Sequence, residues 1–225
     1  MVDKAIKKEE GYSVTKMLGF TSLLCILLLA GRIYFTTRFA FTFLVWNLFL
    51  AWVPLFISKR IIILDNQGKS GVITGSLFFV WLLFFPNAPY IITDLFHLRP
   101  VADVPLWFDL ILIISFAWNA LMIGFVSLLE IQRFLNRKFS EQLSWSVIIS
   151  VLILCGFGVY LGRYERWNTW DILFNTDSLF TSVFSTILNP VSHPRTIGVT
   201  AMFSSFLIVS YVTLFVLIKS KKYGK

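Results

Sequence analysis

The chain contains few of the residues that build metal and redox sites. Its 225 residues include two cysteines and two histidines. Cys25 and Cys155 form no C-x-x-C pair, so we expect them to pack as small hydrophobic side chains. No H-E-x-x-H or G-x-S-x-G motif occurs. The Gly-Lys-Ser sequence at 68–70 is no phosphate loop, because Ile63 stands where that motif requires glycine. Nothing in the sequence requires a cofactor.

Charge is also scarce, and it lies between long apolar runs. Charged residues make up 14% of the chain and hydrophobic residues 57%, against about 25% charge in a soluble domain. A bilayer core about 30 Å thick needs roughly 20 apolar residues of helix. The runs do not alternate apolar and polar residues as a membrane β-barrel requires. We therefore predict an all-α, polytopic membrane helix bundle in one domain, residues 1–225, with spans near 17–35, 39–58, 70–93, 107–129, 143–162 and 196–218.

The basic residues are distributed unevenly over the two sets of alternate loops. With six spans, one set holds 14 of the 20 Lys and Arg residues and six of the 12 Asp and Glu residues, whereas the other set holds six of each. Basic residues favour the cytoplasmic side, so we predict that both termini are cytoplasmic. The basic side suits anionic lipid headgroups, and the distribution argues against a nucleic-acid partner. Oligomeric state is left open.

The third apolar run contains two prolines, Pro86 and Pro89. Proline removes a helix donor and clashes with the preceding turn, so this span should kink or break in the outer part of the bilayer. Broken helices at membrane depth often line a binding site, although a proline kink can also serve packing alone. If helix resumes after the break, four polar residues fall on one stripe: Asn87, Tyr90, Asp94 and His97.

Asp94 and His97 are the strongly polar, ionisable pair of that stripe. Ionisable groups at this depth need a partner, and the two can share a hydrogen bond, a proton or a metal ion. A metal ion needs at least a third ligand, for which Asp171 and His193 on the same predicted side are the candidates. These four residues are our candidate catalytic residues and, with less support, candidate metal ligands. A structural hydrogen-bonded pair is the alternative.

A second polar segment follows the fifth span at residues 163–171. Its tryptophans suit the headgroup region as anchors, and Asp171 suits the start of a helix, so much of the segment has a structural interpretation. In the functional interpretation its arginines hold a phosphate or carboxylate. With the stripe and an acidic residue of the fourth span, the candidate ligand-binding residues are Asn87, Tyr90, Asp109, Arg163, Glu165, Arg166, Trp167, Asn168 and Trp170.

Residues 177–189 predict a short amphipathic helix in the last outer loop. Leu179, Phe180 and Phe184 belong to its apolar face, and serine and threonine residues form the other face. The segment is too short to span a bilayer. We therefore expect it to lie in the outer interface or to cover the bundle.

Several motifs resemble a bacterial membrane protein family of unknown function, DUF1361. They are FFPNAPYIITDLFHL at 84–98, RWNTWD at 166–171 and NLFLAWVP at 47–54. The resemblance covers most of the chain from the second span onward. It implies a multi-pass protein of the bacterial cytoplasmic membrane, and it implies no activity.

Three functional hypotheses stay open. The first is a ligand-binding or transport protein whose cleft opens to the extracytoplasmic side. The second is a membrane-embedded enzyme that acts on a lipid or envelope precursor at the outer leaflet, so whether the protein is an enzyme is undecided. The third is a structural or assembly partner. The cytoplasmic halves of the spans are nearly all apolar, which disfavours ion conduction and favours a site in the outer half.

Overall fold

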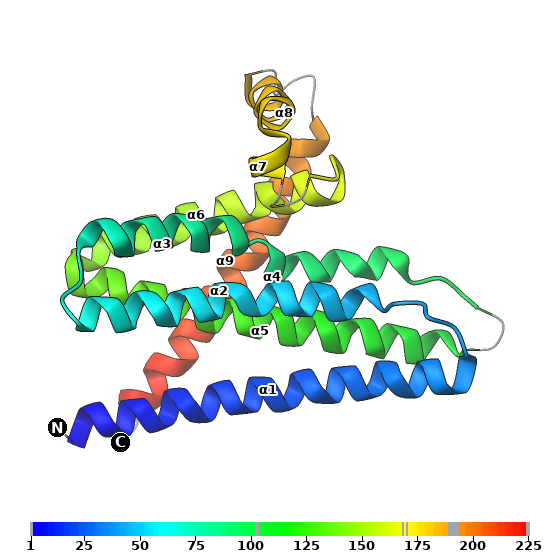
Figure 1. The fold of residues 1–225 in the computed structure, drawn as a ribbon, viewed down its shortest axis with the longest axis horizontal. Coiled ribbons are helices and arrows are strands. Elements are labelled where there is room, and N and C mark those ends of the chain that lie inside the picture. Colours follow the sequence, from blue (N-terminus) through cyan, green and yellow to red (C-terminus); the bar gives the residue numbers. More distant parts are fainter. Residues whose placement is uncertain (1, 102–103, 168, 170, 189–193, 224–225) are drawn as a thin grey trace.

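The computed structural model describes residues 2–101, 104–167, 169, 171–188 and 194–223, and these form helices joined by short connections (Figure 1). The third predicted span is divided into three short elements, of which η1 is a 3-10 helix. In chain order the elements are α1 (Val2–Thr36), α2 (Phe43–Asn66), α3 (Gly71–Phe84), α4 (Asn87–Tyr90), η1 (Ile91–His97), α5 (Leu106–Lys138), α6 (Glu141–Arg163), α7 (Asp171–Phe174), α8 (Thr176–Leu188) and α9 (Pro194–Tyr223).

Six segments of the described chain are long and apolar enough to cross a bilayer, so the protein is a multi-pass membrane protein. Each overlaps one predicted span, which confirms the all-α membrane architecture. The second and third segments begin later than predicted, at Phe43 and Gly71, whereas the other limits lie beyond the predicted ones. The largest extensions are at the ends of α2 and α5, which continue as charged helix past the apolar runs. The six segments are Val14–Thr36, Phe43–Asn66, Gly71–His97, Leu106–Lys138, Glu141–Arg163 and Pro194–Ser220.

Helix α5 is the central element of the bundle. It packs against α1, α2, α4, η1 and α6, and α9 packs along α6. The buried side chains of α5 recur at helical spacing, as Leu112, Phe116, Ala120 and Ile123 illustrate. Among the residues that the structure describes, none from α5 lines the cavity of the candidate site.

Polar side chains also join the helices at membrane depth. Trp52 Nε1 of α2 and Asn119 Nδ2 of α5 both donate to Ser22 Oγ of α1, at 3.1 Å and 2.7 Å. Thr21 Oγ1 donates to Asn119 Oδ1 at 2.7 Å. Each such bond contributes on the order of 0.6 kcal/mol in a membrane, and at most about 2 kcal/mol. These bonds fix α1 against the centre of the bundle.

One end of the bundle is tied together by charge. Asp65 at the end of α2 accepts from Lys138 Nζ at 2.6 Å and lies 3.2 Å from Arg137 Nη2 at the end of α5. Arg137 Nη1 also donates to Asn66 at 3.1 Å. Both chain ends lie on this side of the molecule (Figure 1). The first turn of α1 and the last turn of α9 are thus at the same end of the bundle, as an even number of spans requires.

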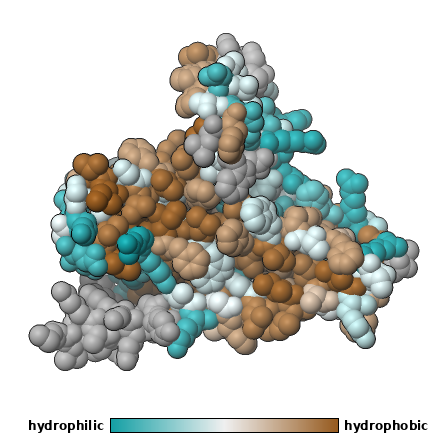
Figure 2. Space-filling model, viewed as in Figure 1, coloured by the Kyte–Doolittle hydropathy of each residue, from teal (hydrophilic) through white to brown (hydrophobic). Residues whose placement is uncertain are grey.

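The outer surface of the helices is apolar, and α8 lies apart from the main bundle. Figure 2 shows a brown face across the spans, with teal residues near their ends and around α8. Helix α8 matches the predicted amphipathic helix but begins one residue earlier, and residue 189 lies outside the described residues. Leu179 is buried, whereas Phe180 and Phe184 stack on each other and stay exposed. Its exposed aromatic side chains suit the interface between bilayer and water.

Candidate functional site

The third span breaks at Pro86, as the sequence predicts. Helix α3 ends at Phe84, and the N–H of Ala88 bonds the carbonyl of Phe85 at 3.1 Å in place of that of Phe84. This shift takes the N–H of Ala88 away from the Phe84 carbonyl. The Asn87 side chain bonds that carbonyl instead, since Asn87 Nδ2 donates to the Phe84 carbonyl oxygen at 2.9 Å. The backbone groups that proline releases inside a membrane must find such partners. The break is thus a stable part of the fold.

Glycine residues of α6 let the broken segment come close. A Cβ atom on Gly158 would lie 3.0 Å from Cγ of Pro86, and one on Gly162 would lie 3.0 Å from the ring of Tyr90. Both distances are shorter than ordinary side-chain contacts, so these positions favour glycine. The contact fixes α4 against α6 and leaves space on the side that faces α2.

That space is a cavity of about 540 Å³, lined by α2, the broken span, α6 and the segment up to α8. Its volume lies in the range of about 300–1,000 Å³ that is typical of small-molecule sites. We call Asn47, Asp94, His97 and Arg163 its polar end. We call Leu50, Leu82, Leu83, Val151, Leu154, Phe157 and Leu161 its apolar part.

The polar end is a connected set of side chains from three elements. Asn47 Nδ2 of α2 donates to Asp94 Oδ2 of η1 at 2.8 Å. The guanidinium of Arg163, at the end of α6, lies 3.9 Å from Asp94 Oδ1 and 3.0 Å from His97 Nε2 through Nη1. Asp94 is 1% exposed, and a carboxylate buried to that degree needs such partners. The set therefore depends on the break, which brings η1 alongside α6.

The chemistry of arginine fixes the role of His97. Arginine carries N–H donors and no acceptor, so the 3.0 Å contact requires His97 Nε2 to accept. The imidazole is then neutral, with its proton on Nδ1. Its ring packs edge-on against Phe43, and the Arg163 guanidinium lies 5.2 Å from the centre of the Phe96 ring. Aromatic rings thus hold both groups in place.

The segment after α6 folds back over the cavity. Arg166 has a left-handed backbone with φ of 60°, and the N–H of Trp167 returns to the Leu161 carbonyl at 3.1 Å. The Trp167 side chain lines the cavity, and its Nε1 is buried without a hydrogen-bond partner among the described residues. Thr169 Oγ1 accepts from Asn87 Nδ2 at 3.3 Å. The segment therefore closes one wall and offers an unused donor.

The structure brings together many, but not all, of the residues predicted to form a site. Glu165 accepts from the Tyr160 hydroxyl at 2.9 Å, and Arg166 is exposed. Asp171 begins α7 and accepts from Asn175 Nδ2 at 2.6 Å. None of these three lines the cavity. Asn168, Trp170 and His193 lie outside the described residues. The predicted residues that do line the cavity are Asn87, Tyr90, Asp94, His97, Arg163 and Trp167.

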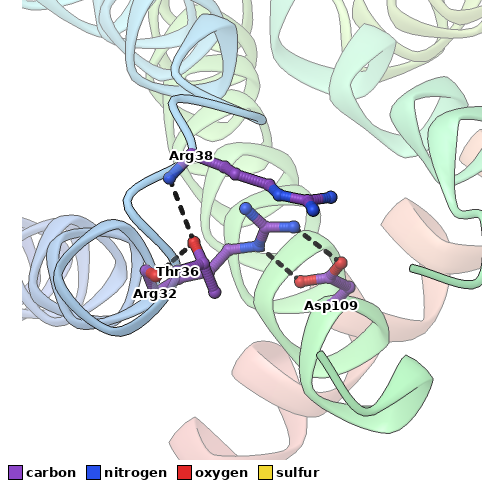
Figure 3. A network of polar contacts seen from close by, with 4 residues as sticks. All are labelled: Arg32, Thr36, Arg38 and Asp109. Carbon is purple, nitrogen blue, oxygen red and sulfur yellow. Dashed lines mark hydrogen bonds and ion pairs between the residues drawn. The ribbon is translucent and has the colours of Figure 1, made fainter. Parts of the chain in front are cut away.

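Asp109 also lies away from the cavity, in a different buried pair. Its two carboxylate oxygens accept from Arg32 Nε at 2.6 Å and Nη2 at 3.0 Å (Figure 3). Thr36 Oγ1 donates to the Arg32 carbonyl at 2.8 Å and accepts from the N–H of Arg38 at 3.3 Å. Both charged side chains are at most 2% exposed. The fourth-span acid is thus committed to fixing α1 against α5.

No group of three His, Cys, Asp or Glu side chains in the described residues is placed to hold a metal ion. The sequence interpretation also missed members of the site. Asn47 and Thr169 both line the cavity and are not among the residues predicted to form the site. Asn47 is identifiable in principle, since an amide in a span demands a partner. No sequence signal marks Thr169, because its role depends on how the segment after α6 folds back.

The comparisons with known proteins agree with the motifs. A family model described as "Protein of unknown function (DUF1361)" matches residues 46–210. The match includes α2, the broken third span, α6 and the segment over the cavity. No curated protein and no solved structure matches the chain.

Proposed function

Since the chain belongs to the DUF1361 family of proteins of unknown function, we propose a function from the cavity itself: the protein binds an amphiphile that comes from the bilayer. The observation that carries this proposal is the division of one cavity into a polar end and an apolar part. Binding sites for such molecules combine apolar walls with a few converging polar groups. The polar end would hold a headgroup, and the apolar part would hold a hydrocarbon chain.

Side chains at the edge of the cavity support entry from the bilayer. Trp46, Leu83 and Leu154 line the cavity, yet they are 54%, 44% and 53% exposed. All three lie within the membrane-spanning segments. Apolar side chains that are both exposed and cavity-lining mark an opening toward lipid. A ligand that is already dissolved in the bilayer would reach the cavity sideways between the helices.

Packing on the other side of the break favours binding over conduction. Trp81 is fully buried, donates its Nε1–H to Ser127 Oγ at 2.7 Å, and packs 4.9 Å from the Phe85 ring. An ion that crossed the span would need polar groups along its path. The surroundings of α3 are apolar and do not provide a polar path, so the ligand would stay in one leaflet.

The cavity opens, in our proposal, on the extracytoplasmic side of a bacterial cytoplasmic membrane. The support is the charge distribution: most of the basic residues belong to the connections at the end where Asp65 pairs with Arg137 and Lys138. That end is cytoplasmic by the positive-inside rule. The polar end of the cavity belongs to the opposite half of the spans.

The proposal is tested with two neighbouring substitutions in α6. Leu154→Trp fills the apolar part, whereas Ile153→Trp adds the same bulk at a position that is 46% exposed and does not line the cavity. Phospholipids with a fluorophore on one acyl chain are titrated into the purified protein. We expect saturable binding to the native chain and to Ile153→Trp, and at least a tenfold loss in Leu154→Trp. Equal binding by all three proteins would contradict the proposal.

A second candidate function is an enzyme that acts on the bound amphiphile. The observation that favours it is the presence of the Asp94 carboxylate and the neutral His97 imidazole at the same end of the cavity. Such a pair can move protons at a bound headgroup. Incubation of the native protein with radiolabelled phospholipid, followed by chromatography, is the test. A product that Asp94→Asn and His97→Gln both abolish would establish the enzyme, and an unchanged lipid would leave binding alone.

A further inference from the structure

We propose that the ligand of this cavity is a lipid with a singly negative phosphodiester headgroup, and that Arg163 binds that headgroup. The inference rests on the proposed function, since it names the chemical class of the amphiphile. It follows from three observations: the charge of the polar end, its unused donors and the length of the apolar part.

The charged groups of the polar end are Arg163 and Asp94, and the two are only loosely paired, since Arg163 Nη1 lies 3.9 Å from Asp94 Oδ1. Arg163 Nη1 also lies 3.0 Å from His97 Nε2, which accepts, so that imidazole is neutral. Asp94 is the one carboxylate that lines the cavity among the described residues, and Asn47 already donates to it. The Arg163 guanidinium is therefore available to a single negative charge on a ligand. A phosphodiester supplies that charge and matches the geometry of guanidinium donors.

Several hydrogen-bond donors around the cavity are also left without acceptors among the described residues. Among the described residues, the polar contacts of Arg163 run through Nη1, which leaves Nη2 and Nε with donors. Trp167 Nε1 is buried without a described partner and belongs to the same cavity. Phosphate oxygens are pure acceptors, so they suit a site with surplus donors better than an ammonium group does. Buried donors without acceptors are costly, and a bound phosphodiester would remove that cost.

The apolar part has the length of one leaflet. Its α6 side chains run from Leu161 to Val151, about 15 Å at a rise of 1.5 Å per residue. Half of a hydrocarbon core of about 30 Å is the same length. A free phosphate would leave this part empty, whereas a lipid acyl chain that runs parallel to α6 fills it. The shape therefore favours a whole lipid over a small soluble anion.

The experiment compares two fluorescent phospholipids with identical chains, phosphatidylglycerol and phosphatidylcholine. We expect the native protein to bind phosphatidylglycerol about tenfold more tightly, or about 1.4 kcal/mol, since the cationic choline of phosphatidylcholine offsets the phosphate charge beside the Arg163 guanidinium. Arg163→Gln should abolish the preference. Arg166→Gln should keep it, because Arg166 carries the same charge nearby but is exposed and outside the cavity. Millimolar inorganic phosphate should not displace the probe.

The outcomes separate this inference from the proposed function. Equal affinity for both lipids, with Leu154→Trp still blocking them, would overturn the anionic headgroup and leave the binding of an amphiphile intact. Displacement by inorganic phosphate would overturn the lipid as ligand. Arg163→Gln leaves the Asp94 carboxylate without its cationic neighbour. If that variant does not fold, the double variant Arg163→Gln with Asp94→Asn, which also removes this carboxylate, takes its place in the test. A preference that survives in that double variant would contradict the role of Arg163.

Discussion

The Asn47 side-chain amide donates to Oδ2 of Asp94 at 2.8 Å and so joins the second span to the 3-10 segment behind the proline break. We expect Asn47→Leu to destabilise the protein by about 1–3 kcal/mol, because a buried carboxylate loses its donor. The double variant Asn47→Leu with Asp94→Leu should cost less, since both polar groups are gone. Thermal unfolding in detergent measures both. A double variant that is less stable than Asn47→Leu would argue against this account of the pair.

The Arg32–Asp109 pair gives a second test of buried charge. Arg32→Met leaves the Asp109 carboxylate, which is 2% exposed, without its main partner, and should cost about 3–5 kcal/mol. Arg32→Met combined with Asp109→Leu should recover most of that loss, because well-packed apolar residues replace a buried pair at little cost. A double-mutant cycle by thermal unfolding checks the coupling. Additive losses would mean that the two residues do not stabilise one another.

The contact between α6 and α9 depends on Gly156. A Cβ atom there would lie 2.8 Å from the Thr200 carbonyl oxygen and 3.0 Å from the Ser204 backbone nitrogen. We therefore expect Gly156→Ala to destabilise the protein by about 1–3 kcal/mol through overpacking. Gly75→Ala is the control, since nothing lies within 4 Å of a Cβ at that helical position. It should be neutral or stabilising by up to about 1 kcal/mol. Equal effects of Gly156→Ala and Gly75→Ala on stability would contradict the close approach of α6 and α9.

The proposed sidedness is tested by cysteine labelling in intact cells. Both native cysteines are buried, so the labelling of an exposed cysteine introduced by substitution can be measured without reaction of the native ones. Arg99→Cys and Pro105→Cys, at the end near the cavity, should react with a membrane-impermeant maleimide. Gln67→Cys and Asn136→Cys, at the opposite end, should react only after the cells are opened. The reverse pattern would place the cavity on the cytoplasmic side.

The helical architecture was predictable because the lipid bilayer around the chain dictates it. Lipid forces each uncharged run into helix, so six spans and the break at Pro86 follow from composition and proline chemistry. The stripe of Asn87, Tyr90, Asp94 and His97 also follows, since the short helices after the break keep enough helical spacing for all four to line one cavity.

The sequence does not show which single polar residues line the cavity, because tertiary contacts decide it. Asp109 and Asp94 are both acids in the predicted outer half of a span, and the sequence alone does not show that Asp109 pairs with Arg32 of the first span. Arg163 and Arg166 lie one helical turn apart, but the left-handed backbone at Arg166 turns the chain back. Only one of the two therefore lines the cavity.

The most direct test of the central claim is an experimental structure of the protein in bilayer nanodiscs that contain phosphatidylglycerol. We predict one elongated density in the cavity, with its phosphate against Arg163 and its chain along α6 as far as Leu154 or Val151. A cavity filled by its own side chains or by water alone, under the same conditions, would contradict the claim that this protein binds a membrane amphiphile there.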